Sequence, residues 1–174
     1  MKECPVAQSF LDSLYEKKIL KYEWTEVLSD EIQYEPDINE YFLLKGLNKS
    51  GAIVRYLHED TWKLVDAKLS IDGLKPKDAE QLALFDALLD PNIKILSISG
   101  PAGSGKSFLS IAYGLSTILS DKSMTLVLTK STETVGSSKF FGSMPGDVME
   151  KFSPFLDSFD LQIRKLTGDK TYFD

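Results

Sequence analysis

The hydrophobic and polar positions along the chain change period several times, and each period predicts an element. In the first 36 residues, apolar side chains recur near helical spacing at Phe10, Leu11, Leu14, Ile19 and Leu20. This spacing predicts a short amphipathic helix, with Ser9 and Asp12 as candidate caps at its start. Residues 21–36 are rich in Glu and Tyr and are expected to be irregular or extended.

Three short β-prone runs follow, and turn signals at residues 48–51 and 58–60 separate them. The runs cover residues 41–44, 52–57 and 61–65, and the last of them alternates apolar and polar side chains. Because the runs are short and closely spaced, they predict a small antiparallel meander over residues 37–72.

The remaining residues carry longer apolar patterns. Residues 77–89 and 108–119 show helical spacing, and the first of these patterns stops at Asp90-Pro91. Residues 93–99 and 124–129 are apolar runs typical of buried strands. The order helix, strand, loop, helix, strand predicts an α/β fold with a parallel sheet, preceded by the small antiparallel β segment. We therefore expect three regions: an acidic helical or irregular extension (1–36), the meander (37–72) and the α/β core (73–174).

Composition narrows the class of protein. Hydrophobic residues make up 43% and charged residues 26%, which is typical of a globular chain. No apolar run approaches the roughly 18 residues that cross a bilayer, and the N-terminus lacks the apolar stretch of a secretory signal, so neither is expected. The single Cys4 excludes an internal disulfide and favours a reducing, cytoplasmic setting.

The net charge of −6 is unevenly distributed. Residues 1–92 contain 11 basic and 18 acidic side chains, a balance of −7, whereas residues 93–174 contain 9 and 8, a balance of +1. An acidic chain is not a nucleic-acid binder on charge alone. The near-neutral second half leaves room for a local anion site.

The junction between the first predicted buried strand and the next helix matches G-x-x-x-x-G-K-[ST] at every position. The matching residues are Gly100, Pro101, Ala102, Gly103, Ser104, Gly105, Lys106 and Ser107, and Phe108 follows them. The glycines are able to take positive φ, so that backbone N–H groups point into a concave nest. The helix N-terminus adds unpaired donors and a positive dipole end. We interpret this segment as a P-loop, the phosphate-binding loop of an NTPase.

In this interpretation Lys106 reaches the β- and γ-phosphates as the candidate catalytic residue, and the Ser107 hydroxyl is the candidate Mg²⁺ ligand. The expected cofactors are ATP and Mg²⁺. Hydrolysis also needs an acidic residue that holds the metal, yet no apolar run of about four residues after Ser107 ends in Asp or Asp-Glu. Open sheets usually contain about four to six strands. We therefore expect the parallel sheet to be incomplete and the chain to be a fragment of a longer ATPase domain.

Residues 39–160 resemble the PhoH family of P-loop ATPases, and in particular the ATPase half of bacterial proteins that join a PIN domain to a PhoH domain. Besides the loop, the resemblance is carried by the β segment from residue 39, L-K-P-K-D-A-E-Q (74–81), F-G-S-M-P-G-D (141–147) and E-K-F-S-P-F (150–155). Many ATPases share the loop, whereas the last two segments are much more specific.

The resemblance implies a fold like that of superfamily 1 helicases and implies ATP hydrolysis, with coupling to RNA left open. It assigns Gln81 to the adenine, since a carboxamide donates and accepts hydrogen bonds at once; the alternative is a solvated helix residue.

Lys130 stands where the family has the arginine of T-R-P, and lysine lacks the bidentate phosphate contact of arginine. Lys130 therefore either contacts the nucleotide or a nucleic acid, or has no functional contact. The D-E-A-Q box of the family is not found in this sequence.

Three functions stay open: an ATPase of PhoH type, a nucleotide-binding module or subunit fragment without hydrolysis, and an RNA-linked motor.

Asp147 is either a helix N-cap or part of a ligand-gated loop, and residues 136–139 either contact nucleic acid or form a solvated loop. Trp24 and Trp62 are expected to be packed aromatics rather than base-stacking platforms. No membrane partner is expected, and the oligomeric state is left open.

Overall fold

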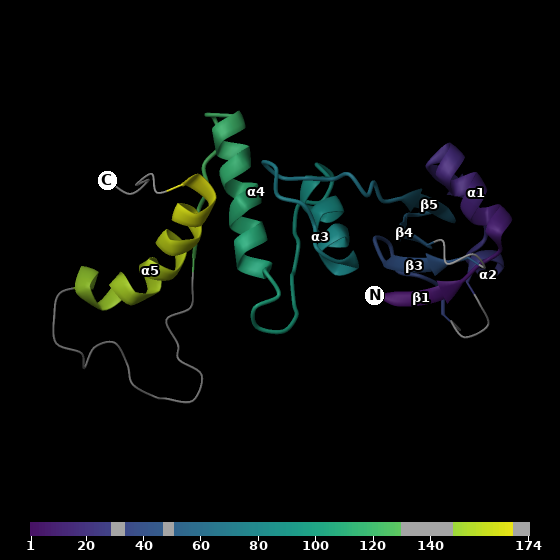
Figure 1. Cartoon of the computed structure of the whole chain (residues 1–174), viewed down its shortest axis with the longest axis horizontal. Helices are drawn as coiled ribbons and strands as arrows, with labels where there is room; N and C mark the ends of the chain where they lie inside the picture. Colours follow the sequence, from purple (N-terminus) through teal and green to yellow (C-terminus); the bar gives the residue numbers. More distant parts are fainter. Residues whose placement is uncertain (29–33, 47–50, 130–147, 169–174) are drawn as a thin grey trace. The chain divides into compact units, whose positions relative to one another are not determined.

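The computed structural model describes residues 1–28, 34–46, 51–129 and 148–168. The chain divides into two compact units, Met1–Leu96 and Ser97–Asp174 (Figure 1). The first unit holds the elements from β1 to α3, and the second holds α4 and α5. The domain boundaries that the hydrophobic pattern suggests at residues 36 and 72 stay predictions.

A five-stranded mixed sheet forms the centre of the first unit. The antiparallel pairs β3–β4 and β4–β5 confirm the predicted meander. β1 lies parallel to β3 and β2 lies antiparallel to β5, so residues from the first 36 positions form both edges of the sheet. The order is β1-β3-β4-β5-β2, with strands β1 (Lys2–Pro5), β2 (Ile19–Lys21), β3 (Tyr41–Lys45), β4 (Gly51–Tyr56) and β5 (Thr61–Leu64).

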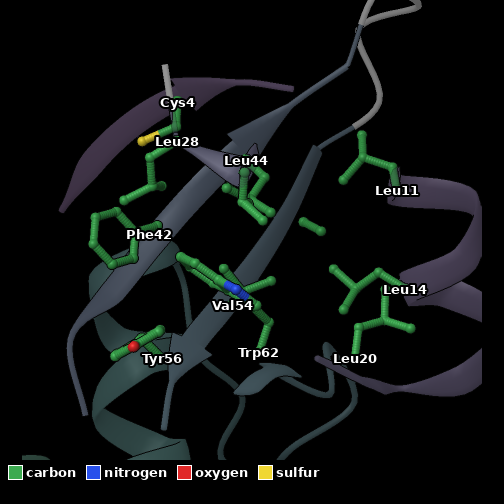
Figure 2. Close-up of a cluster of buried hydrophobic side chains, with 12 residues drawn as sticks. Cys4, Leu11, Leu14, Leu20, Leu28, Phe42, Leu44, Val54, Tyr56 and Trp62 are labelled. Carbon is green, nitrogen blue, oxygen red and sulfur yellow. The ribbon is translucent and has the colours of Figure 1, made fainter. Parts of the chain in front are cut away.

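One face of this sheet carries the core of the first unit. The helices α1 (Gln8–Lys17) and α2 (Trp24–Val27) contribute apolar side chains to it. Successive side chains of a strand face opposite ways, so alternate strand residues point to this side. Figure 2 shows side chains of α1 directed toward those of the strands. The fully buried members are Cys4, Leu11, Leu14, Phe42, Leu44, Val54 and Trp62.

Both tryptophans are packed aromatics, as predicted. The indole N–H of Trp62 donates to the carbonyl oxygen of Tyr22 at 2.9 Å, and its ring meets those of Phe42 and Tyr56 edge-on. Trp24 is partly buried against the same cluster. A buried ring with a satisfied N–H is typical of a structural aromatic rather than of a surface platform for bases.

The first helix is shorter than its hydrophobic spacing predicts. α1 ends at Lys17 because Lys18 adopts a left-handed conformation, with φ of 65°. Ile19 and Leu20 therefore belong to β2, where Leu20 pairs with Trp62. The predicted caps are also wrong, because the N-cap residue is Ala7, which makes no side-chain hydrogen bond.

α3 (Ala79–Leu89) lies over the opposite face of the sheet. It begins after Asp78, whose carboxylate accepts a hydrogen bond from the Gln81 N–H at 2.7 Å, and it ends before Asp90, close to the predicted bounds. The strand residues that reach it are polar and lie in register on three neighbouring strands: Tyr41, Arg55 and Lys63.

In the second unit, α4 (Lys106–Ser120) and α5 (Val148–Thr167) pack against each other. α4 confirms the predicted second helix of the core. The small core between the two helices consists of Ile111, Leu115 and Ile163, with Leu126 and Leu128 packed against it.

The two predicted buried strands are not strands in the structure. Residues 93–99 and 124–129 form no ladder with any described segment, and Ile95 is 92% and Val127 75% exposed. An apolar sequence is only half of what makes a strand, because the backbone N–H and C=O groups also need a paired neighbour. The α/β class is borne out by the mixed sheet and its helices, whereas a parallel sheet of these two segments is not formed among the described residues.

Candidate phosphate-binding site

The loop that precedes α4 is curled by its glycines. Gly100, Gly103 and Gly105 have φ of 152°, 79° and 90°, in the region that favours glycine. A Cβ atom on Gly103 would meet nothing within 4 Å, so backbone conformation alone requires glycine there. The prediction that these three residues adopt positive φ is confirmed.

The loop ends at Gly105, which is the N-cap residue of α4. Gly105 has no side chain to cap the helix, and the first turn of α4 contains no acidic residue. The first backbone N–H groups of a helix have no partners within the helix and carry the positive end of its dipole. With neither a capping side chain nor an acid in the first turn, these groups are suited to an anion from outside the chain.

The ammonium group of Lys106 lies against this loop. Its Nζ atom donates to the carbonyl oxygens of Gly100 at 2.8 Å and Pro101 at 2.6 Å, and to Ser104 Oγ at 3.3 Å. None of the ion pairs found in the described parts of the chain involves Lys106. Within those parts, its hydrogen-bond partners are neutral oxygen atoms, which leaves its positive charge available to an anionic ligand.

Ser107 is exposed at the start of α4 and offers a hydroxyl oxygen. Across the described residues there is no group of three or more His, Cys, Asp or Glu side chains that would hold a metal ion. Mg²⁺ keeps several of its waters and is commonly bound through few protein ligands together with substrate phosphates. The residues present therefore fit Mg²⁺ that arrives with a nucleotide.

The predicted loop residues form one continuous segment with the first turn of α4, in which Pro101 and Ala102 are exposed and Phe108 is half-buried. Gln81 lies in the first unit, in the first turn of α3, where its Oε1 atom accepts a hydrogen bond from the Lys77 N–H at 3.0 Å. Lys130 lies outside the described residues, as do residues 136–139 and the G-S-M-P-G-D segment with Asp147.

An ionic network between the sheet and α3 is the main polar feature that the sequence analysis missed. Arg55 of β4 is only 3% exposed. Its Nη1 atom lies 2.6 Å from Asp90 Oδ2 and 3.2 Å from Asp86 Oδ2. Its Nε and Nη2 atoms donate to Asn39 Oδ1 at 2.9 and 2.6 Å. The sequence signal for this network is a charged residue inside an apolar run. Arg55 lies within the β-prone run 52–57, and Asp86 lies within the helical pattern 77–89.

The carboxylate of Asp86, the centre of this network, has three donors. Lys63 Nζ lies 2.9 Å from Oδ1, and the hydroxyl group of Tyr41 donates to Oδ2 at 2.8 Å, beside Arg55. Burial, with the negative charge of Asp86, raises the pKa of Tyr41, so that its hydroxyl stays a donor. The network is balanced in charge, since two cations face the two carboxylates of Asp86 and Asp90.

Two further groups of this network have shifted pKa values. Burial by itself lowers the pKa of Arg55, but the hydrogen bonds to Asp90 and Asp86 outweigh burial and raise it. The backbone N–H of Asn92 and then the guanidinium of Arg55 hold the pKa of Asp90 below its ordinary value. Both shifts favour the charged forms that the ion pairs require.

A glycine-rich turn that brings a lysine and a serine to a helix N-terminus is the local architecture of a phosphate-binding loop. The family model described as PhoH-like protein matches residues 73–172. This match covers more than half of the chain, and the chain belongs to the PhoH family. The resemblance seen in the motifs is thereby confirmed.

Curated relatives carry the same family name. The chain is 32% identical over 108 residues to Protein PhoH2 of Thermobispora bispora, which covers 62% of this chain and 24% of that protein. It is 25% identical over 166 residues to Protein PhoH2 of Bacillus subtilis, which covers 89% and 34%. The chain thus spans about a quarter to a third of the length of these relatives. No solved structure matches it.

None of the described helices combines the length and the apolarity that crossing a membrane requires.

Proposed function

We propose that this chain is part of a PhoH-type ATPase that binds Mg-ATP at residues 100–108 and hydrolyses the bond between its β- and γ-phosphates. The observation that carries the proposal is the Lys106 ammonium group, which neutral oxygen atoms hold against a glycine-curled loop at the N-terminus of α4. Membership of the PhoH family supports the same function.

The proposed roles follow from the chemistry of each group. Backbone N–H groups of the loop and of the first turn of α4 bind the phosphates. Lys106 exchanges its neutral partners for β- and γ-phosphate oxygens, because charge-assisted hydrogen bonds are roughly twice as strong as neutral ones. Mg²⁺, when bound, neutralises phosphate charge, and the Ser107 hydroxyl is its protein ligand. Gln81 is proposed to bind adenine and Lys130 a phosphate, on family resemblance alone.

The test of nucleotide binding is the thermal unfolding midpoint of the full chain with and without millimolar Mg-ATP. We expect Mg-ATP to raise the midpoint, because a ligand that binds only the folded state stabilises it. The shift should vanish in Lys106→Ala and persist in Lys122→Ala, which removes an exposed lysine just beyond α4. A folded wild-type sample without a shift, or a Lys106→Ala variant that retains it, would contradict the proposal.

Binding without hydrolysis is the second candidate function. It is considered because hydrolysing sites also use an acidic residue to hold the metal, and between Ser107 and Asp174 no apolar run of about four residues ends in one. Steady release of phosphate decides between the two. A rate above that of Lys106→Ala supports the ATPase, and a rate equal to that control, with binding intact, supports the binding module.

Coupling to RNA rests on family likeness alone, because the chain as a whole is acidic. Its signature is phosphate release that rises with single-stranded RNA, together with RNA binding that weakens steeply as salt increases. We also propose a reducing, cytoplasmic setting, on the strength of the single and buried Cys4.

A further inference from the structure

The donors of the Lys106 ammonium group are matched by acceptors of its own loop. An ammonium group has three N–H donors and no acceptor. Within the described residues, it donates to the carbonyl oxygens of Gly100 and Pro101 and to the hydroxyl oxygen of Ser104. Since there is one donor for each of these oxygen atoms, a phosphate oxygen has to displace at least one of them before it binds Lys106.

The Ser104 hydroxyl is the partner that is most readily displaced. Its Oγ atom lies 3.3 Å from Lys106 Nζ, just beyond the usual range of N–H···O distances. The carbonyl oxygens of Gly100 and Pro101 lie closer, at 2.8 and 2.6 Å. Ser104 is also the one partner of the three that acts through its side chain, so a substitution removes its contact and leaves the two carbonyl oxygens in place.

The backbone of the loop fixes the position of this hydroxyl group. The Ser104 N–H donates to the carbonyl oxygen of Pro101 at 3.4 Å, and Ser104 is half-buried. A Cβ atom on Gly100 would lie 3.5 Å from Ser104 Oγ and 3.8 Å from Lys106 Cδ. The hydroxyl group and the lysine side chain therefore both pack close to Gly100, and their contact is part of the curled loop.

We propose that Ser104 is a positioning residue that restrains Lys106: its hydroxyl group occupies the third donor of the ammonium group, and a phosphate oxygen takes that donor by displacing Ser104. The inference rests on the proposed function, in which Lys106 binds the β- and γ-phosphates, and it deepens the account of that site. Because ligand and Ser104 compete for one donor, the contact lowers the affinity for any polyphosphate, with or without a base.

Two substitutions separate this role from a general disturbance of the loop. Ser104→Ala removes the hydroxyl group but keeps the N–H that donates to Pro101, so one donor of Lys106 becomes available. Ser104→Thr is the matched control, because threonine keeps the hydroxyl group. Neither substitution changes the charge of the loop.

The first measurement tests the contact itself and needs no nucleotide. Formaldehyde and a borohydride methylate lysine side chains of the full chain, and mass spectrometry of its peptides gives the rate at each position. The exposed Lys122, just beyond α4, is the internal reference. We expect Ser104→Ala to raise the rate at Lys106 relative to Lys122, and Ser104→Thr to leave this ratio as in the wild type.

The second measurement compares the dissociation constants of Mg-ATP and of inorganic tripolyphosphate with Mg²⁺ on the full chain. We expect Ser104→Ala to bind both ligands about fivefold more tightly, which is the affinity equivalent of one ordinary hydrogen bond. Ser104→Thr should bind both ligands as the wild type does. An equal gain for the two ligands follows from the proposal, since the competition takes place at the phosphates.

Weaker binding by Ser104→Ala would mean that the hydroxyl group helps to hold the ligand, and it would overturn the restraining role. Unchanged dissociation constants, an unchanged methylation ratio, a gain for Mg-ATP alone, or the same gain in Ser104→Thr would overturn it as well. A wild-type chain that binds neither ligand would instead overturn the proposed function, whereas the methylation rates would still report the contact between Ser104 and Lys106.

Discussion

At the scale of single residues, the candidate phosphate-binding loop at residues 100–107 has a backbone conformation that agrees with its sequence motif. Gly103 has φ of 79°, and nothing surrounds its missing Cβ, so steric strain in the backbone is the whole reason for glycine at this position. L-residues other than Asn and Asp rarely enter this region, because Cβ approaches the following carbonyl oxygen.

We therefore expect Gly103→Ala to lower the free energy of unfolding by about 1 kcal/mol, the typical cost of a left-handed alanine. Gly103→Asn should cost less, because asparagine tolerates this conformation. Urea unfolding of the three proteins without nucleotide measures both differences. The strain argument fails if the alanine variant is as stable as the wild type, or if asparagine is the worse of the two.

At the scale of elements, the residues at the ends of a helix determined its bounds more than the spacing of its apolar residues did. Asp78 caps α3 as a residue of its type should, because its carboxylate accepts the N–H of Gln81. For α1, the helical spacing of apolar residues continues beyond Lys17, where the helix ends. The helix ends there because Lys18 takes a left-handed conformation, and the sequence has no glycine at that position to signal it.

Removing the cap of α3 in Asp78→Ala should lower the free energy of unfolding by about 1 kcal/mol, because a donor at the helix start loses its partner. Asp12→Ala is the control, since Asp12 is an exposed residue of α1 whose carboxylate accepts a hydrogen bond from the Gln8 side chain at 3.0 Å but does not cap the helix. Thermal or urea unfolding gives the comparison. Equal losses in the two variants would show that the cap contributes no more than any exposed carboxylate.

At the scale of the whole molecule, the acidic charge of the chain coexists with a charge-balanced network in the first unit. The pKa of Asp90 is held below its ordinary value of 3.8 by the Asn92 N–H and then by Arg55. A carboxyl group with a lowered pKa stabilises the fold fully above its ordinary value, and this contribution is lost as the pH falls through the lowered one.

The free energies of unfolding of the wild type and Asp90→Asn should therefore differ by a constant amount near neutral pH. Their difference should shrink as the pH falls below 3.8, because Asp90 of the unfolded chain then takes up a proton while Asp90 of the folded chain, whose pKa is lowered, still keeps its charge. Denaturant unfolding across this range measures the difference, in which the titration of unrelated carboxyl groups cancels. A difference that does not depend on pH would mean that the Asp90 charge does not stabilise the folded state.

The positive φ of the glycines in residues 100–107, the helices α3 and α4, and the central meander were predictable because their signals are local. A glycine's backbone freedom, a capping aspartate and a short alternating run act over a few neighbouring residues. The edge strands β1 and β2 were not predictable, since four or three residues carry too little pattern and depend on partners such as Phe42 and Trp62 far along the chain.

The sequence by itself determined the positions where glycine must stand, the family of the chain and the chemistry of the candidate phosphate site, because these reside in adjacent residues. Only the tertiary structure decided which apolar runs become strands and which charged residues become buried. Residues 93–99 have the composition of a strand without a ladder, whereas Arg55 and Asp86, 31 positions apart, form a buried pair. Hydrogen-bonded ladders and ion pairs need two partners, and folding alone brings distant partners together.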